Sequence, residues 1–308
     1  MKDVVSVITS FYNDENYILA CINSINNQLI NDQFLIEYIL VNDCSTDSTV
    51  DIIKLYFNEH TNNNINVRII NTPKNLGPGG AKKLGISKAS GNYFMFLDAD
   101  DYYLRNDFIL RAYSIITNKN ADIVEFGYTM VNDNGEHQDH FVKDLLLIEN
   151  NKELNMHAMF YKAYIGFMPW TKIIKRNIVE SKEYDLDRQF DDIRTIPYWV
   201  YNANKIIIVN SIEINYRNKL DSIIRKNSNE TRLGVITSIC SLFEYFKNNK
   251  NIIKSMYDRC LPDLRTIIDY DSDDEYFREM SKINTKMLSY IYPNNYKDIT
   301  YDVEWNIN

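Results

Sequence analysis

Short apolar runs alternate with amphipathic segments over the first 130 residues. The runs are rich in β-branched residues and end in polar ones, which is typical of buried strands. We expect strands at 4–8, 37–41, 67–70, 93–97 and 123–128. Between them, apolar residues recur every three or four positions, which predicts helices at 17–25, 50–57, 81–89 and 108–116. This order indicates an α/β fold with a mostly parallel sheet flanked by helices.

Polar residues stand directly after three of these strands. Thr9 and Ser10 form a polar turn after the first, Asp43 follows the second, and residues 98–101 follow the fourth. Ligands of parallel α/β sheets bind beyond the carboxyl ends of the strands. We therefore expect these side chains to gather at one edge of the sheet.

The pattern weakens between Asn132 and Leu154, where we expect a mixed or irregular segment. A helix is predicted at 191–202 and a strand at 205–209. After Asn227 the sequence favours helices at 233–246, 252–264 and 276–290. We therefore divide the chain into an α/β domain over 1–226, with halves 1–101 and 102–226, and a C-terminal helical extension over 227–308. The extension either packs on the domain, forms a homodimer contact or selects a substrate.

Composition and charge narrow the partners of the protein. The chain has 308 residues and a net charge of −8, and no dense cluster of Lys and Arg offsets this acidity, so nucleic acid is disfavoured. Its four cysteines form no CxxC pair, which disfavours a disulfide framework. No apolar run approaches ~18 residues, so neither a signal peptide nor a spanning helix is indicated. A cytoplasmic location, or a peripheral one at a membrane surface, follows as the expectation.

The segment Asp98-Ala99-Asp100-Asp101 carries the clearest chemical signal. Three carboxylates in four positions repel one another unless solvent or a cation compensates their charge. Mg²⁺ and Mn²⁺ take one or two carboxylates together with water and phosphate oxygens. An acidic helix start is the alternative, since negative side chains favour a helix N-terminus. The segment alone leaves both interpretations open.

Two neighbouring motifs also suit a nucleotide. Asp43 can accept hydrogen bonds from a base or a ribose, or it can cap the helix that follows. The glycine-rich segment from Asn75 through Gly77 to Lys82 brings backbone amides and an ammonium group toward a phosphate. A plain turn between a loop and a helix is its alternative interpretation.

In this order and spacing the motifs resemble those of the family-2 glycosyltransferases, over about residues 3–225. The resemblance is carried by residues 5–13, 41–49, 75–86 and 89–101. It implies a GT-A fold, with a nucleotide-sugar half at 1–101 and an acceptor half at 102–226. It also implies an inverting, metal-dependent transfer from a nucleotide diphosphate sugar, usually a UDP-sugar. The acceptor would be a glycan, a lipid-linked glycan or a protein.

The resemblance assigns roles to the residues of the first half. The nucleotide site would be lined by Thr9, Ser10 and Tyr12, and Asp43 would contact the base. The donor would be flanked by Asn75, Gly77 and Lys82, while Asp98 beside Ala99 would face the ribose or sugar. Asp100 would hold Mn²⁺ or Mg²⁺, and Asp101 would assist it. Two positions depart from the family pattern. Ser10 stands where proline is usual, and Lys82 where arginine is usual. Lysine cannot offer the bidentate fork of arginine.

In the second half, Asp191 and Asp192 match the family's paired acidic motif, whose second acid is the usual base. That role carries over to Asp192, although a helix N-terminus also favours two acidic residues. Trp170 is either a sugar-stacking platform on the acceptor side or a buried core residue. Arg217 would contact the diphosphate or hold the acidic pair in place.

Two other function classes remain in view. A sugar nucleotidyltransferase would share the sheet and the metal carboxylates, but its basic glycine-rich loop is absent from residues 8–20. A catalytically silent binding module with the same fold is the second alternative. The joint presence of Asp43, Asp98, Asp100 and Asp192 disfavours it.

Overall fold

The computed structural model describes residues 2–132, 135–160, 162–181, 190–219, 229–256 and 282. In its first part, strands and helices alternate almost where the apolar pattern predicted them. These elements are β1 (Asp3–Phe11), α1 (Ile18–Asn26), β2 (Phe34–Asn42), α2 (Thr49–Glu59), β3 (Ile65–Asn71), α3 (Gly77–Lys88) and β4 (Tyr93–Phe96).

The remaining elements are shorter and more varied. They are β5 (Tyr102–Tyr103), α4 (Phe108–Asn118), β6 (Ile123–Val131), β7 (His137–Phe141), β8 (Leu146–Glu149), α5 (Lys152–Phe160), the 3₁₀ turn η1 (Pro169–Thr171), β9 (Lys172–Lys175), α6 (Arg176–Val179), α7 (Asp191–Asn202), β10 (Lys205–Arg217) and α8 (Asn229–Phe246). A further helical segment covers 250–256.

The described strands form one sheet in the order β3-β2-β1-β4-β9-β6-β10-β5, with β7 beside β6 and β8 beside β10. β3, β2, β1 and β4 are parallel, as predicted. β9 then enters antiparallel between β4 and β6, and β10 returns parallel to β6. The predicted α/β class is confirmed; its parallel character belongs to the first half, and the second half of the sheet is mixed.

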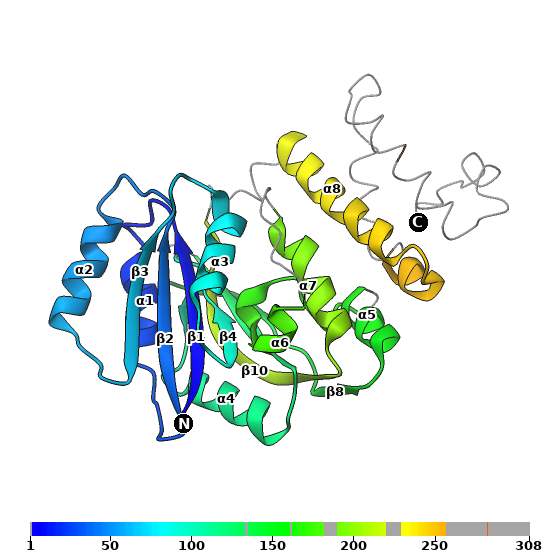
Figure 1. The fold of residues 1–308 in the computed structure, drawn as a ribbon, viewed down its shortest axis with the longest axis horizontal. Helices are drawn as coiled ribbons and strands as arrows, with labels where there is room; N and C mark the ends of the chain where they lie inside the picture. Colours follow the sequence, from blue (N-terminus) through cyan, green and yellow to red (C-terminus); the bar gives the residue numbers. More distant parts are fainter. Residues whose placement is uncertain are drawn as a thin grey trace.

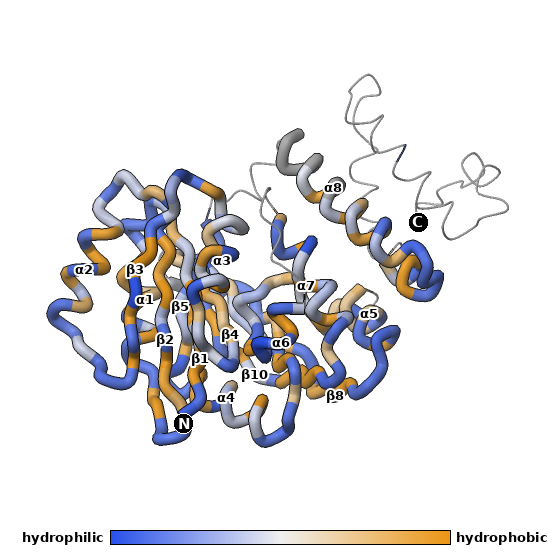
Figure 2. The backbone as a smooth tube through the Cα atoms, in the orientation of Figure 1, coloured by the Kyte–Doolittle hydropathy of each residue, from blue (hydrophilic) through white to orange (hydrophobic). Residues whose placement is uncertain are grey.

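Neighbouring residues of β1 show that helices cover both faces of the sheet, because successive side chains of a strand point to opposite sides. Ile8 lies against Gly85 of α3, where an added Cβ would meet its Cγ2 at 2.6 Å. Thr9 lies on the other side, against Cys21 of α1, with 4.0 Å between Oγ1 and Sγ. Figure 1 shows the resulting layers, and Figure 2 shows the hydrophobic strands between them.

Two segments differ from the sequence-based expectation, and a third is resolved more finely. Thr9 and Ser10 do not form a turn, because β1 pairs with β2 as far as Phe11. The segment 132–154 is mixed, the first of its two expected forms, because its described residues contain β7, β8 and the start of α5. The strand predicted at 205–209 continues to Arg217 and pairs with β6 along its length. The longer β10 therefore delivers its last residues to the same edge as β1 and β4.

The helical extension packs on the domain through α8, which is the first of the three roles considered for it. Tyr198 of α7 meets Tyr245 and Phe246 of α8 at centroid distances of 4.4 and 6.0 Å. Arg194 Nε donates to Ser238 Oγ at 2.9 Å. The boundary at 226 lies outside the described residues, as do most of the helix predicted at 252–264 and all of the one predicted at 276–290 except residue 282. Every helix in the described ranges is too short or too polar to span a bilayer.

Candidate active site

The loop after β1 supplies one partly exposed aromatic ring and one half-buried carboxylate. Tyr12 is 49 % exposed, and its amide donates to Asp14 Oδ2 at 3.1 Å. Burial raises the pKa of Asp14 to about 6, and the charges of Asp100 and Asp98 add to the rise. Thr9 does not line an open surface as expected. Its side chain is fully buried and accepts a hydrogen bond from Tyr38 OH at 3.3 Å.

Asp43 follows β2 and ties two loops together. Its amide donates to Phe11 O at 2.9 Å, and its Oδ1 accepts bonds from Thr72 Oγ1 and Leu76 N, both at 2.8 Å. It does not cap α2, because Asp47 accepts the Thr49 amide there, at 3.0 Å. Asp43 therefore fixes the glycine-rich loop to the end of β2.

Asn75 and Gly77 occupy that loop at the start of α3. Asn75 Nδ2 donates to Asp43 O at 3.2 Å, and its Oδ1 accepts the Gly77 amide at 3.2 Å. Gly77 has φ of +73°, a conformation that side-chain-bearing residues rarely adopt. The loop predicted from the glycines is thus shaped by hydrogen bonds to Asp43.

Lys82 of α3 interacts with carboxylates from both predicted halves of the site, the acidic segment after β4 and the start of α7. Its Nζ lies 3.3 Å from Asp98 Oδ1, and the side chain is only 10 % exposed. Burial lowers the pKa of Lys82, but Asp98, Asp191 and Asp192 raise it, and the net shift is upward. The lysine at the expected arginine position therefore lies among the donor-side and acceptor-side carboxylates together.

Asp100 pairs with a lysine that the sequence motifs did not indicate. Lys219 Nζ lies 2.7 Å from Asp100 Oδ2 and 4.0 Å from Asp14 Oδ1. It also stands over the ring of Tyr17, 4.8 Å from its centroid. Lys219 follows the end of β10, so the rule that polar residues gather beyond strand ends applies to it too. It was missed because the strand was predicted to end at 209.

Asp101 lies behind the other two acids. Its side chain is buried, and its Oδ1 accepts the Arg217 amide at 2.8 Å. Its Oδ2 has no hydrogen-bond partner among the described residues. Burial raises the pKa of Asp101 well above the usual range, with further contributions from Asp100 and Asp98. This placement favours a role in fixing the end of β10 over a share in metal binding.

Arg217 lies beside the acidic segment through its guanidinium as well. Its Nε donates to Asp100 O at 3.1 Å, and its Cζ stands 5.1 Å from the ring centroid of Tyr17 and 5.6 Å from that of Tyr102. The structure therefore places the guanidinium next to Asp100, in the acidic segment that follows β4.

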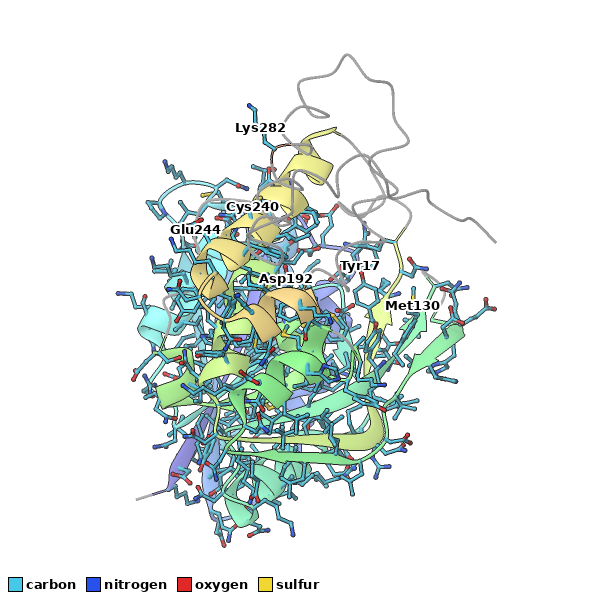
Figure 3. All side chains as sticks on the ribbon, turned by 90° about the vertical axis from the view of Figure 1, so that its right-hand side faces the viewer. Tyr17, Met130, Asp192, Cys240, Glu244 and Lys282 are labelled. Carbon is cyan, nitrogen blue, oxygen red and sulfur yellow. The ribbon has the colours of Figure 1, made fainter. Side chains whose placement is uncertain are left out.

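Asp191 and Asp192 begin α7, in agreement with both interpretations of the pair. Asp191 is buried, and its Oδ2 has no hydrogen-bond partner among the described residues. Burial and the charge of Asp191 raise the pKa of Asp192 while Lys82 opposes the rise, and the resulting pKa is about 6. Figure 3 labels Asp192 and Tyr17, which lie at a similar height in the molecule. A carboxylate with such a pKa is ionised at neutral pH and is basic enough to take a proton.

Trp170 belongs to the core, the second of its two alternatives. It is 5 % exposed, stacks on Tyr216 at 5.2 Å and meets Tyr128 edge-on at 4.9 Å. Its neighbour Lys172 is fully buried beside Glu125, with 3.4 Å between Nζ and Oε2. Trp170 therefore supports the acceptor half from inside the fold instead of offering a free stacking face.

A divalent cation is compatible with these residues only in part. Across the described ranges, no three His, Cys, Asp or Glu side chains already converge on one point. Asp98 and Asp100 keep 32 % and 23 % of their side-chain surface exposed, and each is paired with one lysine. Mg²⁺ and Mn²⁺ commonly take one or two carboxylates and complete their shell with water and phosphate oxygens. Asp100, with Asp98 beside it, fits that requirement once a diphosphate is present.

Comparison with known proteins gives consistent results. The sequence profile of glycosyl transferase family 2 matches residues 6–180. The glycosyltransferase GlyG of Streptococcus pneumoniae is 28 % identical over 73 % of this chain and 74 % of its own length.

Two solved structures share the fold. Residues 1–349 of S. aureus TarS, in complex with UDP-GlcNAc, match 94 % of this chain and 82 % of that chain, with a TM-score of 0.72 and 18 % identity. The mannosyltransferase PcManGT from Pyrobaculum calidifontis, in complex with GDP-Man and Mn²⁺, matches 97 % of this chain and 84 % of that chain, with a TM-score of 0.56 and 13 % identity. At these identities the likeness concerns the fold, and it agrees with the GT-A architecture that the motifs predicted.

Proposed function

Because the chain belongs to glycosyl transferase family 2, we propose that it transfers a sugar from a nucleoside diphosphate, UDP in the first instance, to an acceptor hydroxyl. The observation that carries the proposal is the position of Lys82, whose Nζ lies 3.3 Å from Asp98 Oδ1 and whose pKa is raised by Asp98 and by Asp191 and Asp192 on α7. Donor-side and acceptor-side groups thus share one small region. The UDP-GlcNAc complex of TarS supports the choice of donor.

On the donor side, Tyr12 and Ser10 would contact the nucleotide, and Asp43 would use its remaining oxygen for the base. Asp100 and Asp98 would hold a divalent cation together with the diphosphate. Such a cation supplies Lewis-acid stabilisation of the charge that builds on the leaving phosphate oxygens. The PcManGT complex, which contains Mn²⁺, supports this assignment.

On the acceptor side, Asp192 would accept the proton of the attacking hydroxyl. Its raised pKa, about 6, suits a general base at neutral pH, because the group is ionised there and is more basic than an ordinary carboxylate. Lys82 would compensate the negative charge of the neighbouring carboxylates and so keep Asp192 ionised before the proton is transferred. A single displacement on the face opposite the diphosphate would invert the anomeric centre. A glycan, a lipid-linked glycan or a protein remains the proposed acceptor class.

A donor-hydrolysis panel tests the proposal. UDP-Glc, UDP-GlcNAc and GDP-Man are each incubated with the chain and Mn²⁺, and release of the nucleoside diphosphate is followed. We expect release from a UDP-sugar above all, lost in Asp100→Asn. If the chain neither binds UDP in calorimetry nor releases nucleotide from any donor, the proposed function is wrong.

A further inference from the structure

Lys219 holds three groups of the site at once. Its ammonium lies 2.7 Å from Asp100 Oδ2 and 4.0 Å from Asp14 Oδ1, and it stands over the ring of Tyr17, which Figure 3 labels. Only 18 % of the Lys219 side chain is exposed, so little water screens these charges. The ammonium therefore neutralises the carboxylate that is expected to hold a divalent cation.

A lysine and a divalent cation compete for the same oxygen. Mg²⁺ binds carboxylate oxygens at about 2.0–2.1 Å, which requires room that an ammonium at hydrogen-bond distance fills. Two cations side by side also repel each other, and the repulsion grows where water is scarce. In the donor-free chain, a metal ion must therefore displace Lys219 from Asp100 before it can bind.

A bound diphosphate changes this balance. It adds negative charge next to Asp100 and offers the Lys219 ammonium a second anionic partner. The flexible four-carbon stem of lysine permits the ammonium to move to it. The neighbouring carboxylates Asp14 and Asp98 would then share the metal's charge with the phosphate. Binding of the diphosphate should favour binding of the cation, and the coupling is reciprocal.

We propose that Lys219 is a resident counter-ion, which occupies the cation position at Asp100 in the donor-free chain and passes to the diphosphate when donor and metal bind together. This inference rests on the proposed function. It makes Lys219 a positioning residue for donor and metal, and it orders their binding: the cation enters with the donor rather than ahead of it.

Two calorimetric titrations of the protein test this assignment. One uses Mn²⁺ in the absence of nucleotide, and the other uses UDP in the presence of EDTA. In the absence of nucleotide, Lys219→Met should bind Mn²⁺ at least tenfold more tightly than the native chain, which corresponds to about 1.4 kcal/mol. In EDTA the same variant should bind UDP about tenfold more weakly, because the diphosphate loses its ammonium partner. The factor by which UDP strengthens Mn²⁺ binding should shrink in the variant.

Matched variants separate this effect from general charge removal. Lys219→Arg keeps the charge and should stay close to the native chain in both titrations. Lys54→Met removes a charge from an exposed position of α2 and should change neither titration. Circular dichroism checks folding, and if Lys219→Met does not fold, Lys219→Gln carries the same comparison.

The outcomes distinguish the two proposals. Equal or weaker Mn²⁺ affinity in Lys219→Met, or no Mn²⁺ binding by either chain, overturns the role of Lys219. Failure of both chains to bind UDP under any condition overturns the proposed function instead. Tighter Mn²⁺ binding with weaker UDP binding supports the counter-ion.

Discussion

Lys82 Nζ lies 3.3 Å from Asp98 Oδ1, although the two residues come from α3 and from the segment after β4. The same ammonium also lies within electrostatic reach of Asp191 and Asp192 at the start of α7. A single buried cation thus links the carboxylates assigned to the donor with the one assigned to the acceptor. The predictions below depend on this arrangement and on the charges around it.

Removal of divalent cations should abolish sugar transfer. EDTA should stop activity and excess Mn²⁺ or Mg²⁺ should restore it, because the leaving diphosphate needs a compensating charge. Asp100→Asn should lower kcat by about 10²–10³-fold, the usual cost of losing an electrostatic stabiliser. Asp51→Asn, an exposed acid of α2, is the control. Full activity in EDTA would remove the metal from the mechanism.

Asp192→Asn should separate chemistry from binding. The amide cannot accept the acceptor's proton, so kcat should fall by about 10²–10⁴-fold. UDP affinity, measured by calorimetry, should stay within about threefold, since Asp192 lies on α7 and not among the nucleotide contacts. Turnover at the native rate would assign the base to another group.

The pH profile of kcat should show an acidic limb near pH 6. Asp192 has a pKa of about 6, and only its ionised form can act as a base, so kcat should fall tenfold for each unit of pH below that value. Asp14 has a similar pKa and is the natural competitor for this limb. Asp14→Asn should keep the limb. If that variant loses it, the titrating group is Asp14.

Lys82→Met should move the same limb to higher pH. Lys82 favours the ionised form of Asp192, so its removal raises the pKa of that carboxyl group and a larger fraction is protonated at neutral pH. Lys82→Arg keeps the charge and should leave the limb in place. A limb that stays at the native pH in Lys82→Met would show that the two groups are not coupled.

Lys172→Met should destabilise the fold far more than Lys175→Met. Lys172 is fully buried beside Glu125 and donates to Gly166 O and Met168 O, both at 2.8 Å. Its removal leaves the buried Glu125 carboxylate without its charged partner, so that among the described residues only the Gly166 amide still donates to it, at a cost of about 3–5 kcal/mol. Lys175 pairs with Asp122 nearer the surface and should cost about 1 kcal/mol. Urea unfolding measures both, and equal losses would contradict the prediction.

Much of the donor side could be predicted because it follows directly from strand ends. The apolar strands of the first half end in Asp43 and in residues 98–101, and parallel strands bring those ends to one edge. Asp192 came from its motif at the start of a helix whose bounds were predicted correctly. These features depend on short stretches of sequence, so a single chain was enough to find them.

The features that the sequence did not reveal depend on distant partners. β7 is exposed at all five positions and so lacks the alternation that marks a half-buried strand. Burial of Trp170 depends on Tyr216, which stacks on it from another strand. Lys219 reaches Asp100 only because β10 extends well past its predicted end. In each case the decisive contact joins segments that are far apart in the chain.

The antiparallel entry of β9 sets an order of events during synthesis. β4 pairs with β1 on one side and with β9 on the other, yet Lys172 comes 76 residues after Phe96. At roughly 5–20 residues per second, the free edge of β4 waits about 4–15 s for its partner on the ribosome. An unpaired strand edge invites pairing with another chain. The first half of this protein can therefore form its four parallel strands early, but the edge of β4 stays unpaired on the ribosome until β9 has been made and closes the sheet.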